Sequence, residues 1–311
     1  MSKLPNSLSK ELKSNSKLAS AYTAILDIER DIKDEKNLIF CRILGYLLEC
    51  APGGKARSLV ASEILGCNGD IAMILAIGAW YFEHLDRSFK YTQRKEDSIK
   101  GFSQCSAELD EDLSSPDEYL ASHSAAEDQV KIRDDDHCLL TGSPDLWRWV
   151  KDPDFQERTK DWIPPLYTTH GCHILNHVAE SSGDDYSPSA IWDVITRLDC
   201  QSALEELQGS QVHRLENMMT LSSIAYTLFT NLMVWLVPVP GEPNTYLVEN
   251  DYPGLESAGI RLREKVVFTS RDLEKYPVPS PRYLEIHEAL AKVANLSGAR
   301  HYIQDELLPR F

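Results

Sequence analysis

The chain has no apolar run of the roughly 20 residues that a membrane-spanning helix needs. Its longest apolar stretches, around residues 71–82 and 228–239, are shorter than that. The first 17 residues, MSKLPNSLSKELKSNSK, carry charges, serines and a proline but no apolar core, which argues against a secretory signal. We therefore expect no membrane partner and an intracellular location, in the cytoplasm or the nucleus.

The seven cysteines include no CxxC pair. Their odd number and irregular spacing fit a reducing compartment and argue against a zinc ribbon. The chain also lacks a GxSxG elbow, a P-loop and a dinucleotide-binding fingerprint. Serine hydrolase, nucleoside triphosphatase and Rossmann oxidoreductase functions therefore have no support from motifs.

Positive charge is scarce, with 32 basic and 48 acidic residues and a net charge of -16. The deficit is concentrated in residues 104–237, because residues 1–103 and 258–311 each carry a small excess of basic side chains. Binding to a polyanion requires clustered Lys and Arg, so this balance disfavours nucleic acid as a partner. Any affinity for nucleic acid is expected from the basic residues of the C-terminal region, such as Arg261, Arg263 and Lys265.

Residues 1–103 are predicted to form a helical domain. Apolar residues recur at helical spacing between residues 17 and 48, a Pro-Gly-Gly break follows at 52–54, and an apolar helix is expected from about residue 70. A packing role is the plain interpretation, and a surface for a protein partner is the alternative. Residues 104–136 hold 11 acidic and 2 basic side chains among many serines, which predicts a mobile acidic linker. Part of it, residues 125–132, is open to an alternative interpretation as a short helix.

The C-terminal region, residues 238–311, is predicted to contain a hairpin and a helix packed on the preceding core. The run LMVWLVPVP is followed by a Gly-Glu-Pro-Asn turn and then by TYLVE, which is typical of a hairpin. A further short strand is expected at 266–270. Prolines open a helical pattern that ends at Gly298.

Three short motifs lie between these regions. They are HCLLTG at 137–142, GCHILNH at 171–177 and NMMTLSSIAYTLF at 217–229. The first two have the composition of strands and the third of an apolar helix opened by a polar residue. We expect segments 137–142 and 168–174 to pair antiparallel, with a helix over 217–230 packed on them.

The order Cys-x-x-Thr-Gly, then x-His-Ile, then Asn-x-x-Thr-Leu resembles the HNH endonuclease family. The C-terminal pattern is similar to that of fungal HNH-domain proteins. The resemblance implies an α+β fold with a ββα-metal core at residues 137–237. It implies that His173 is the general base, that Asn217 orients it or the substrate, and that a divalent metal ion (Mg, Mn or Zn) assists phosphodiester hydrolysis.

The chain departs from the family pattern where the metal ligands are expected. Tyr226 occupies the position of the last family histidine, Thr230 that of a common aspartate, and Cys172 that of the aspartate before the base. A cysteine thiolate prefers zinc to magnesium, and a neutral phenol is a weak ligand. Cys172 is therefore the remaining candidate metal ligand, with His173, Asn217 and Tyr226 as the candidate catalytic residues.

Three functions remain open from the sequence. The first is a metal-dependent HNH nuclease, and the second is a degenerate member whose fold serves as a binding or scaffold module. The third is a pocket in which Tyr226 and His173 form an acid/base pair acting on a small molecule. Each residue also has a structural interpretation: a core histidine, a helix N-cap for Asn217, a buried Cys172 and a packed Tyr226. A zinc site made by Cys138, Cys172, His173 and His177 is a further alternative. The sequence indicates no oligomeric state.

Overall fold

A computed structural model of the chain describes residues 3–99, 116–163, 165–175, 189–198, 200–252 and 254–307. The fold is mixed helix and antiparallel sheet, which confirms the predicted α+β class at that level. The chain divides into two compact units that each draw on separate parts of the sequence. Unit 1 comprises residues 1–105, 178–205 and 289–311, and unit 2 comprises residues 106–177 and 206–288. The chain passes repeatedly between the units, so each unit combines segments that are distant in the sequence.

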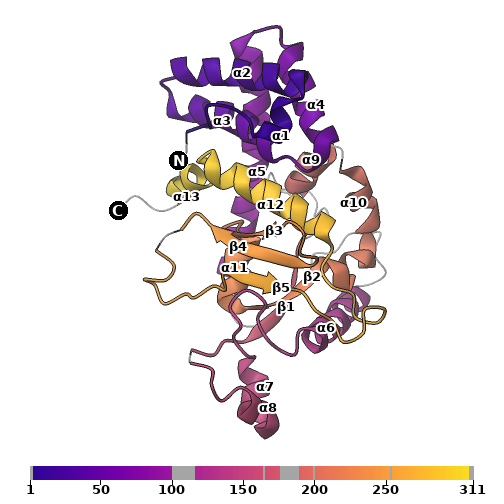
Figure 1. The fold of residues 1–311 in the computed structure, drawn as a ribbon. Coiled ribbons are helices and arrows are strands. Elements are labelled where there is room, and N and C mark those ends of the chain that lie inside the picture. Colours follow the sequence, from indigo (N-terminus) through magenta and orange to yellow (C-terminus); the bar gives the residue numbers. More distant parts are fainter. Residues whose placement is uncertain are drawn as a thin grey trace. The chain divides into compact units, whose positions relative to one another are not determined.

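Unit 1 is helical, as the sequence predicts (Figure 1). Its helices are α1 (Lys10–Lys13), α2 (Ser16–Asp31), α3 (Glu35–Cys50), α4 (Gly53–Gly66), α5 (Ile71–Ile99), α9 (Ser189–Arg197), α10 (Gln201–Glu206, whose last residue belongs to unit 2) and α13 (Ala299–Leu307). Asn15 and Asp34 begin α2 and α3, because their side chains accept hydrogen bonds from the first free backbone N–H groups.

The core of unit 1 is built on the apolar stripe of α2 and the almost entirely buried centre of α3. Ala21 and Ile25, predicted from helical spacing, have no exposed surface. Gly78 of α5 lies against α3, since an added Cβ atom would stand 2.3 Å from the carbonyl oxygen of Phe40. A side chain at this position would push the two helices apart, so glycine sets their close approach.

Unit 2 contains both sheets. Its elements are α6 (Pro116–Arg133), α7 (Leu146–Lys151), α8 (Pro153–Arg158), β1 (Thr169–His173), two short 3-10 helices η1 (Gly209–His213) and η2 (Leu215–Asn217), β2 (Met218–Ser222), α11 (Ser223–Thr230), β3 (Val234–Pro238), β4 (Thr245–Asn250), β5 (Lys265–Val267) and the first half of α12 (Pro281–Leu296). The predicted C-terminal strands form one antiparallel sheet in the order β3-β4-β5 (Figure 1). No helix among the described residues is long and apolar enough to cross a membrane.

The smaller sheet of unit 2 corrects the predicted strand pairing. β1 pairs antiparallel with β2, with His173 opposite Met218 and Gly171 opposite Thr220. The prediction that segment 137–142 pairs with segment 168–174 is therefore wrong. The prediction of a helix over 217–230 is also wrong in its first half, because 218–222 is a strand and α11 begins only at Ser223. Ser222 caps that helix by accepting a hydrogen bond from the backbone N–H of Ala225, so Asn217 is not its N-cap.

The HCLLTG motif forms a tight turn in place of the predicted strand. The N–H of Gly142 donates to the carbonyl of Cys138 at 2.7 Å, and the N–H of Thr141 donates to the Cys138 sulfur at 3.4 Å. Gly142 has φ = +80°, a conformation that side-chain-bearing residues rarely adopt. The Thr-Gly pair is thus the signature of this turn, which meets the outer edge of β2 through one hydrogen bond from the Leu139 N–H to the Thr220 carbonyl.

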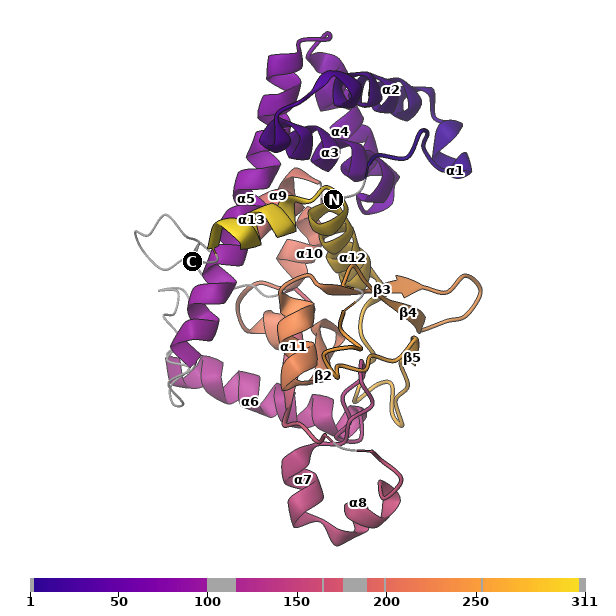
Figure 2. The same ribbon diagram turned by 90° about the vertical axis from the view of Figure 1, so that its left-hand side faces the viewer.

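The predicted acidic linker is largely structured where the chain is described. Residues 116–133 form α6, which packs along β1 and β2 (Figure 2). Its buried face includes Ala126 and Val130, which join Leu215, Met218 and Tyr276 in an apolar cluster. The helix is longer than the 125–132 segment left open from the sequence, because burial of these two residues outweighs the polar composition around them. The remainder of the linker, residues 104–115, lies outside the described residues.

Candidate metal centre

The antiparallel strand pair β1–β2 is referred to here as the β1–β2 hairpin, although residues 174–217 separate its strands. It has two faces, and each carries a different set of the residues selected from the sequence. Successive side chains of a strand point to opposite faces, so His173 and Gly171 share one face while Cys172 and His170 share the other. Helix α6 covers the first face, since a Cβ atom added to Gly171 would stand 3.2 Å from Glu127 of α6. Helix α11 covers the second face, where the ring of its Tyr226 lies 6.4 Å from the ring of His170.

Three histidines meet on the α6 face. They come from three elements: His123 from α6, His173 from the end of β1 and His213 from the end of η1. The Nε2 atom of His173 lies 2.9 Å from the Nδ1 atom of His213. The ring of His123 lies 5.4 Å from that of His173 and 5.2 Å from that of His213, and one nitrogen from each ring lies within 4.8 Å of the others. This arrangement could hold a metal ion.

The apolar pattern of α6 directs His123 into this cluster. His123, Ala126 and Val130 follow one another at intervals of three and four residues, which places them on the same helical face. Ala126 and Val130 are buried against Met218, the residue that pairs with His173 across the hairpin. The hydrophobic contact that fixes α6 on the sheet therefore also fixes His123 beside His173.

Burial controls the charge of His213, the most deeply buried histidine of the cluster. His173 is 9% exposed and His213 is 4% exposed, whereas His123 is only partly buried. Burial, together with the charge of nearby His123, lowers the pKa of His213 from 6.5 to about 4. His213 is therefore neutral at physiological pH. A neutral imidazole offers a lone pair, which is the form that binds a metal ion.

Asn217 has a structural role at the end of the hairpin. It is fully buried, and its side-chain oxygen accepts a hydrogen bond of 3.0 Å from the Leu175 N–H. Its side-chain N–H groups donate to the carbonyl oxygens of Leu175 at 2.8 Å and Val212 at 3.0 Å. The amide thus joins the segment after β1 to the segment before β2. Its N–H groups donate to backbone carbonyl oxygens.

The ligand set implied by the HNH resemblance does not fit this site. Cys172 has no exposed surface, and burial raises the pKa of its thiol well above 9.0, so a neutral thiol faces the apolar interior. Tyr226 lies against His170, while His173 lies on the other face with His123 and His213. The zinc alternative with Cys138 and Cys172 fails for the same reason, because Cys172 and His173 point in opposite directions, and His177 lies outside the described residues. No step of a reaction is therefore assigned to a metal ion at Cys172 or Tyr226.

The sequence interpretation missed His123 and His213. His123 lies in the segment interpreted as a linker, and its spacing to Ala126 and Val130 was the available signal. His213 precedes Asn217 by four residues and has no motif around it. Only the β1–β2 pairing across 44 intervening residues, 174–217, brings it to His173, so no local pattern could have found it.

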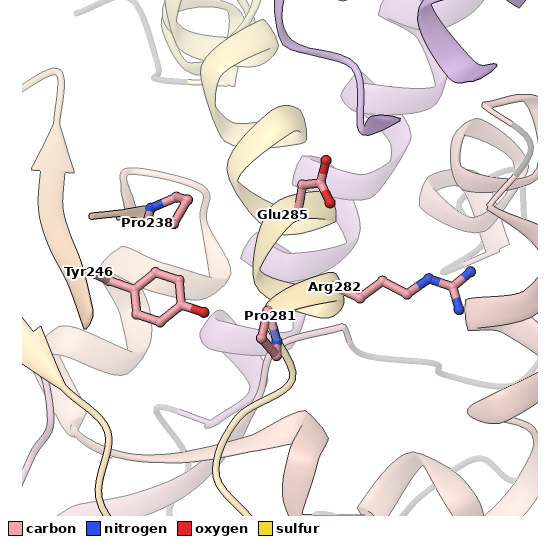
Figure 3. Close-up of a pocket in the computed structure, with 5 residues that line it drawn as sticks. All are labelled: Pro238, Tyr246, Pro281, Arg282 and Glu285. Atoms are coloured by element: carbon pink, nitrogen blue, oxygen red, sulfur yellow. The ribbon is translucent and has the colours of Figure 1, made fainter. Parts of the chain in front are cut away.

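A surface pocket lies elsewhere in unit 2. Its lining comes from the β3–β4 hairpin and the first turns of α12, and Figure 3 shows the hydroxyl of Tyr246 directed toward α12. The lining residues are Pro238, Tyr246, Pro281, Arg282 and Glu285. Arg282 forms an ion pair of 3.0 Å with Glu206 at this surface. The lining contains no histidine or cysteine, and the three clustered histidines His123, His173 and His213 lie outside the pocket.

No protein-family model matches the chain, and neither a curated protein nor a solved structure does.

Proposed function

We propose that this chain is an HNH-like ββα protein in which the β1–β2–α11 unit serves as a scaffold and His173 no longer acts as the base for phosphodiester hydrolysis. The observation that carries the proposal is the separation of the motif residues onto two faces of one hairpin. His173 lies on the face covered by α6. Cys172 lies on the face covered by α11, the helix that carries Tyr226.

Phosphodiester hydrolysis by a base and one metal ion requires both groups at the same phosphate. The base must come within hydrogen-bond reach, about 3 Å, of the attacking water, and the metal ion must contact the phosphate or the leaving oxygen. A strand between the two groups prevents this. In addition, His173 is 9% exposed and its Nε2 atom is already 2.9 Å from His213, which leaves little access for a phosphate.

A scaffold role agrees with the way the hairpin is tied to the rest of unit 2. Arg133, at the end of α6, donates hydrogen bonds of 2.8–2.9 Å to the carbonyl oxygens of Leu215, Met218 and Pro277. The Asp134 carboxylate accepts from the Thr220 N–H at 2.9 Å. Charged groups buried with full sets of partners give rigidity and a single register, not reactivity.

The surface of unit 2 also supports binding in place of catalysis. On α7, Trp147 is 56% exposed and Val150 is 55% exposed. Large apolar side chains grouped on a surface helix are typical of contacts with other proteins. Helices α7 and α8 project from the rest of unit 2 in both views (Figures 1 and 2), so such a contact would leave the hairpin undisturbed.

A nuclease assay tests the proposal. The full chain is incubated with supercoiled plasmid, linear duplex and single-stranded RNA in the presence of Mg²⁺ or Mn²⁺, beside His173→Ala as the matched control. We expect wild type and His173→Ala to leave all substrates intact, even at protein concentrations well above those at which an active nuclease cleaves them. Cleavage by wild type that His173→Ala abolishes would restore the nuclease function and overturn the proposal. Turnover of a small phosphodiester that is lost in both His173→Ala and Tyr226→Phe would favour the acid/base alternative.

A further inference from the structure

We infer that His123, His173 and His213 form a binding site for a zinc-class transition-metal ion, at a position different from the one the HNH resemblance implies. This inference does not rest on the proposed function, because metal binding is measured without nucleic acid.

The separations between the histidine nitrogens are close to those found around a bound metal ion. In a tetrahedral site with Zn–N distances of about 2.0 Å, ligand nitrogens lie about 3.3 Å apart. The Nε2 of His173 and the Nδ1 of His213 are 2.9 Å apart, slightly closer than this, and no pair of ligand atoms in the cluster exceeds 4.8 Å. Because the separations within the cluster are at most 4.8 Å, a shift of no more than about 1.5 Å by the partly exposed His123 would complete the three-nitrogen arrangement.

The chemistry of the donors selects the class of ion. Imidazole nitrogen suits zinc, cobalt, nickel and copper, whereas magnesium and calcium prefer oxygen ligands. The apolar cluster of Ala126, Val130 and Met218 borders the site and lowers the local dielectric, which strengthens coordination by neutral nitrogen. The three described ligands would fill three of the four tetrahedral positions.

The three ligands belong to elements that are distant in the sequence, so an ion would have a structural effect. It would link α6, the end of β1 and η1 at one point. An ion that binds the folded chain and not the unfolded chain raises its stability in proportion to ln(1 + [ion]/Kd). A rise in melting temperature on addition of zinc is therefore an independent measure of occupancy.

The experiment uses the full chain without a histidine tag, stripped of metal by a chelator and titrated with Zn²⁺, with Co²⁺ as a spectroscopic substitute. The test variants are His123→Gln and His213→Gln. The matched control is His170→Gln, which removes a histidine from the same strand as His173 but from the other face. We expect one equivalent of zinc in wild type and in the control, and affinity reduced by roughly tenfold or more in both test variants.

The readouts separate the proposal from its alternatives. Circular dichroism of the metal-free variants checks that they are folded, and His123→Gln replaces a partly exposed residue by a good helix former. No zinc uptake by wild type, or uptake equal in all four proteins, would overturn the site. Absorption by cobalt–thiolate charge transfer would also overturn it, since it would place the ion on cysteines. Because none of these readouts depends on cleavage, the site can fail while the scaffold proposal stands, and the reverse also holds.

Discussion

The two faces of the β1–β2 hairpin carry similar side chains in different settings. On the α6 face, His173 meets two further histidines in a compact cluster. On the other face, the half-exposed His170 lies beside Tyr226 and 4.0 Å from the Glu127 carboxylate of α6, and Cys172 is buried in the core. Residues that are adjacent in a motif are thereby assigned to separate environments, because a strand alternates its side chains. The sequence motif alone suggests a single site, whereas the strand pair places its residues on two opposite faces.

The largest expected effect is a loss of stability caused by a substitution on β1, the strand that both faces share. The substitution Cys172→Asp, which introduces the aspartate that the HNH resemblance implies, would place a carboxylate at a position with no exposed surface. We expect a loss on the order of 4 kcal/mol in the free energy of unfolding, since an unpaired carboxylate must be buried or protonated. Urea denaturation followed by circular dichroism measures this loss.

Two controls show whether the effect belongs to the α11 face. Cys172→Ala removes the thiol without adding charge and is expected to cost about 1 to 2 kcal/mol. Tyr226→His introduces the histidine that the HNH resemblance implies at a half-buried site and is expected to cost less than about 1 kcal/mol. If Cys172→Asp were as stable as wild type, Cys172 would not be sealed in the core. Binding of Mg²⁺ by Cys172→Asp combined with Tyr226→His would show that the α11 face can form a hard-metal site, while the separation of this face from His173 would stand.

A second and smaller effect concerns the clamp that joins the ends of the hairpin. Asn217→Ala removes three buried hydrogen bonds and leaves groups of Leu175 and Val212 without the amide. The expected cost is about 3 kcal/mol, at roughly 1 kcal/mol for each bond. The comparison variant is Asn231→Ala, whose side-chain N–H donates to the Thr227 carbonyl within its own helix turn, and about 1 kcal/mol is expected there. Equal losses at the two positions would mean that Asn217 does not hold the hairpin.

Much of the fold was predictable because it follows from local patterns. The amphipathic stripe of α2, the β3–β4 hairpin with its Gly-Glu-Pro-Asn turn and the helix after Pro279 all depend on neighbours within a few residues. The strand 218–222 was not predictable in this way. Its apolar letters fit a helix equally well, and pairing with β1, far away in the sequence, decides the outcome.

The candidate site was predictable only in part, for the same reason. His173 and Asn217 could be selected because a resemblance spans both of them. Their environments depend on α6, which the acidic composition of residues 104–136 concealed. The centre of the hydrophobic cluster, at Ala126 and Val130, involves only two apolar residues in a polar stretch, too few to outweigh composition in a sequence-based interpretation.

The smallest expected effect compares the acid sensitivity conferred by two buried histidines, His287 beside α11 and His213 in the cluster on the α6 face. His287 of α12 stacks on Phe229 of α11, with ring centroids 3.8 Å apart, and its Nε2 lies 3.1 Å from the Phe229 carbonyl. Burial lowers the pKa of His287 from 6.5 to about 4, and the hydrogen bond to Phe229 opposes this shift. Above pH 6.5 the residue is neutral in both states and makes no difference. Below that pH His287 binds a proton in the unfolded chain but not in the folded chain. The free energy of unfolding therefore falls as pH falls toward 4.

Between pH 6.5 and 5 this histidine alone should reduce the free energy of unfolding by about 2 kcal/mol, at about 1.4 kcal/mol per pH unit. The measurement is urea denaturation at several pH values in a chelating buffer, with His287→Phe and His213→Gln beside wild type. The pKa of His213 is lowered to about 4 on the α6 face, so each variant should remove a similar part of the slope. If His287→Phe flattens the curve and His213→Gln does not, acid acts through His287 and not through His213. The histidine cluster would then accept protons in the folded state, and zinc would have to compete with them below neutral pH.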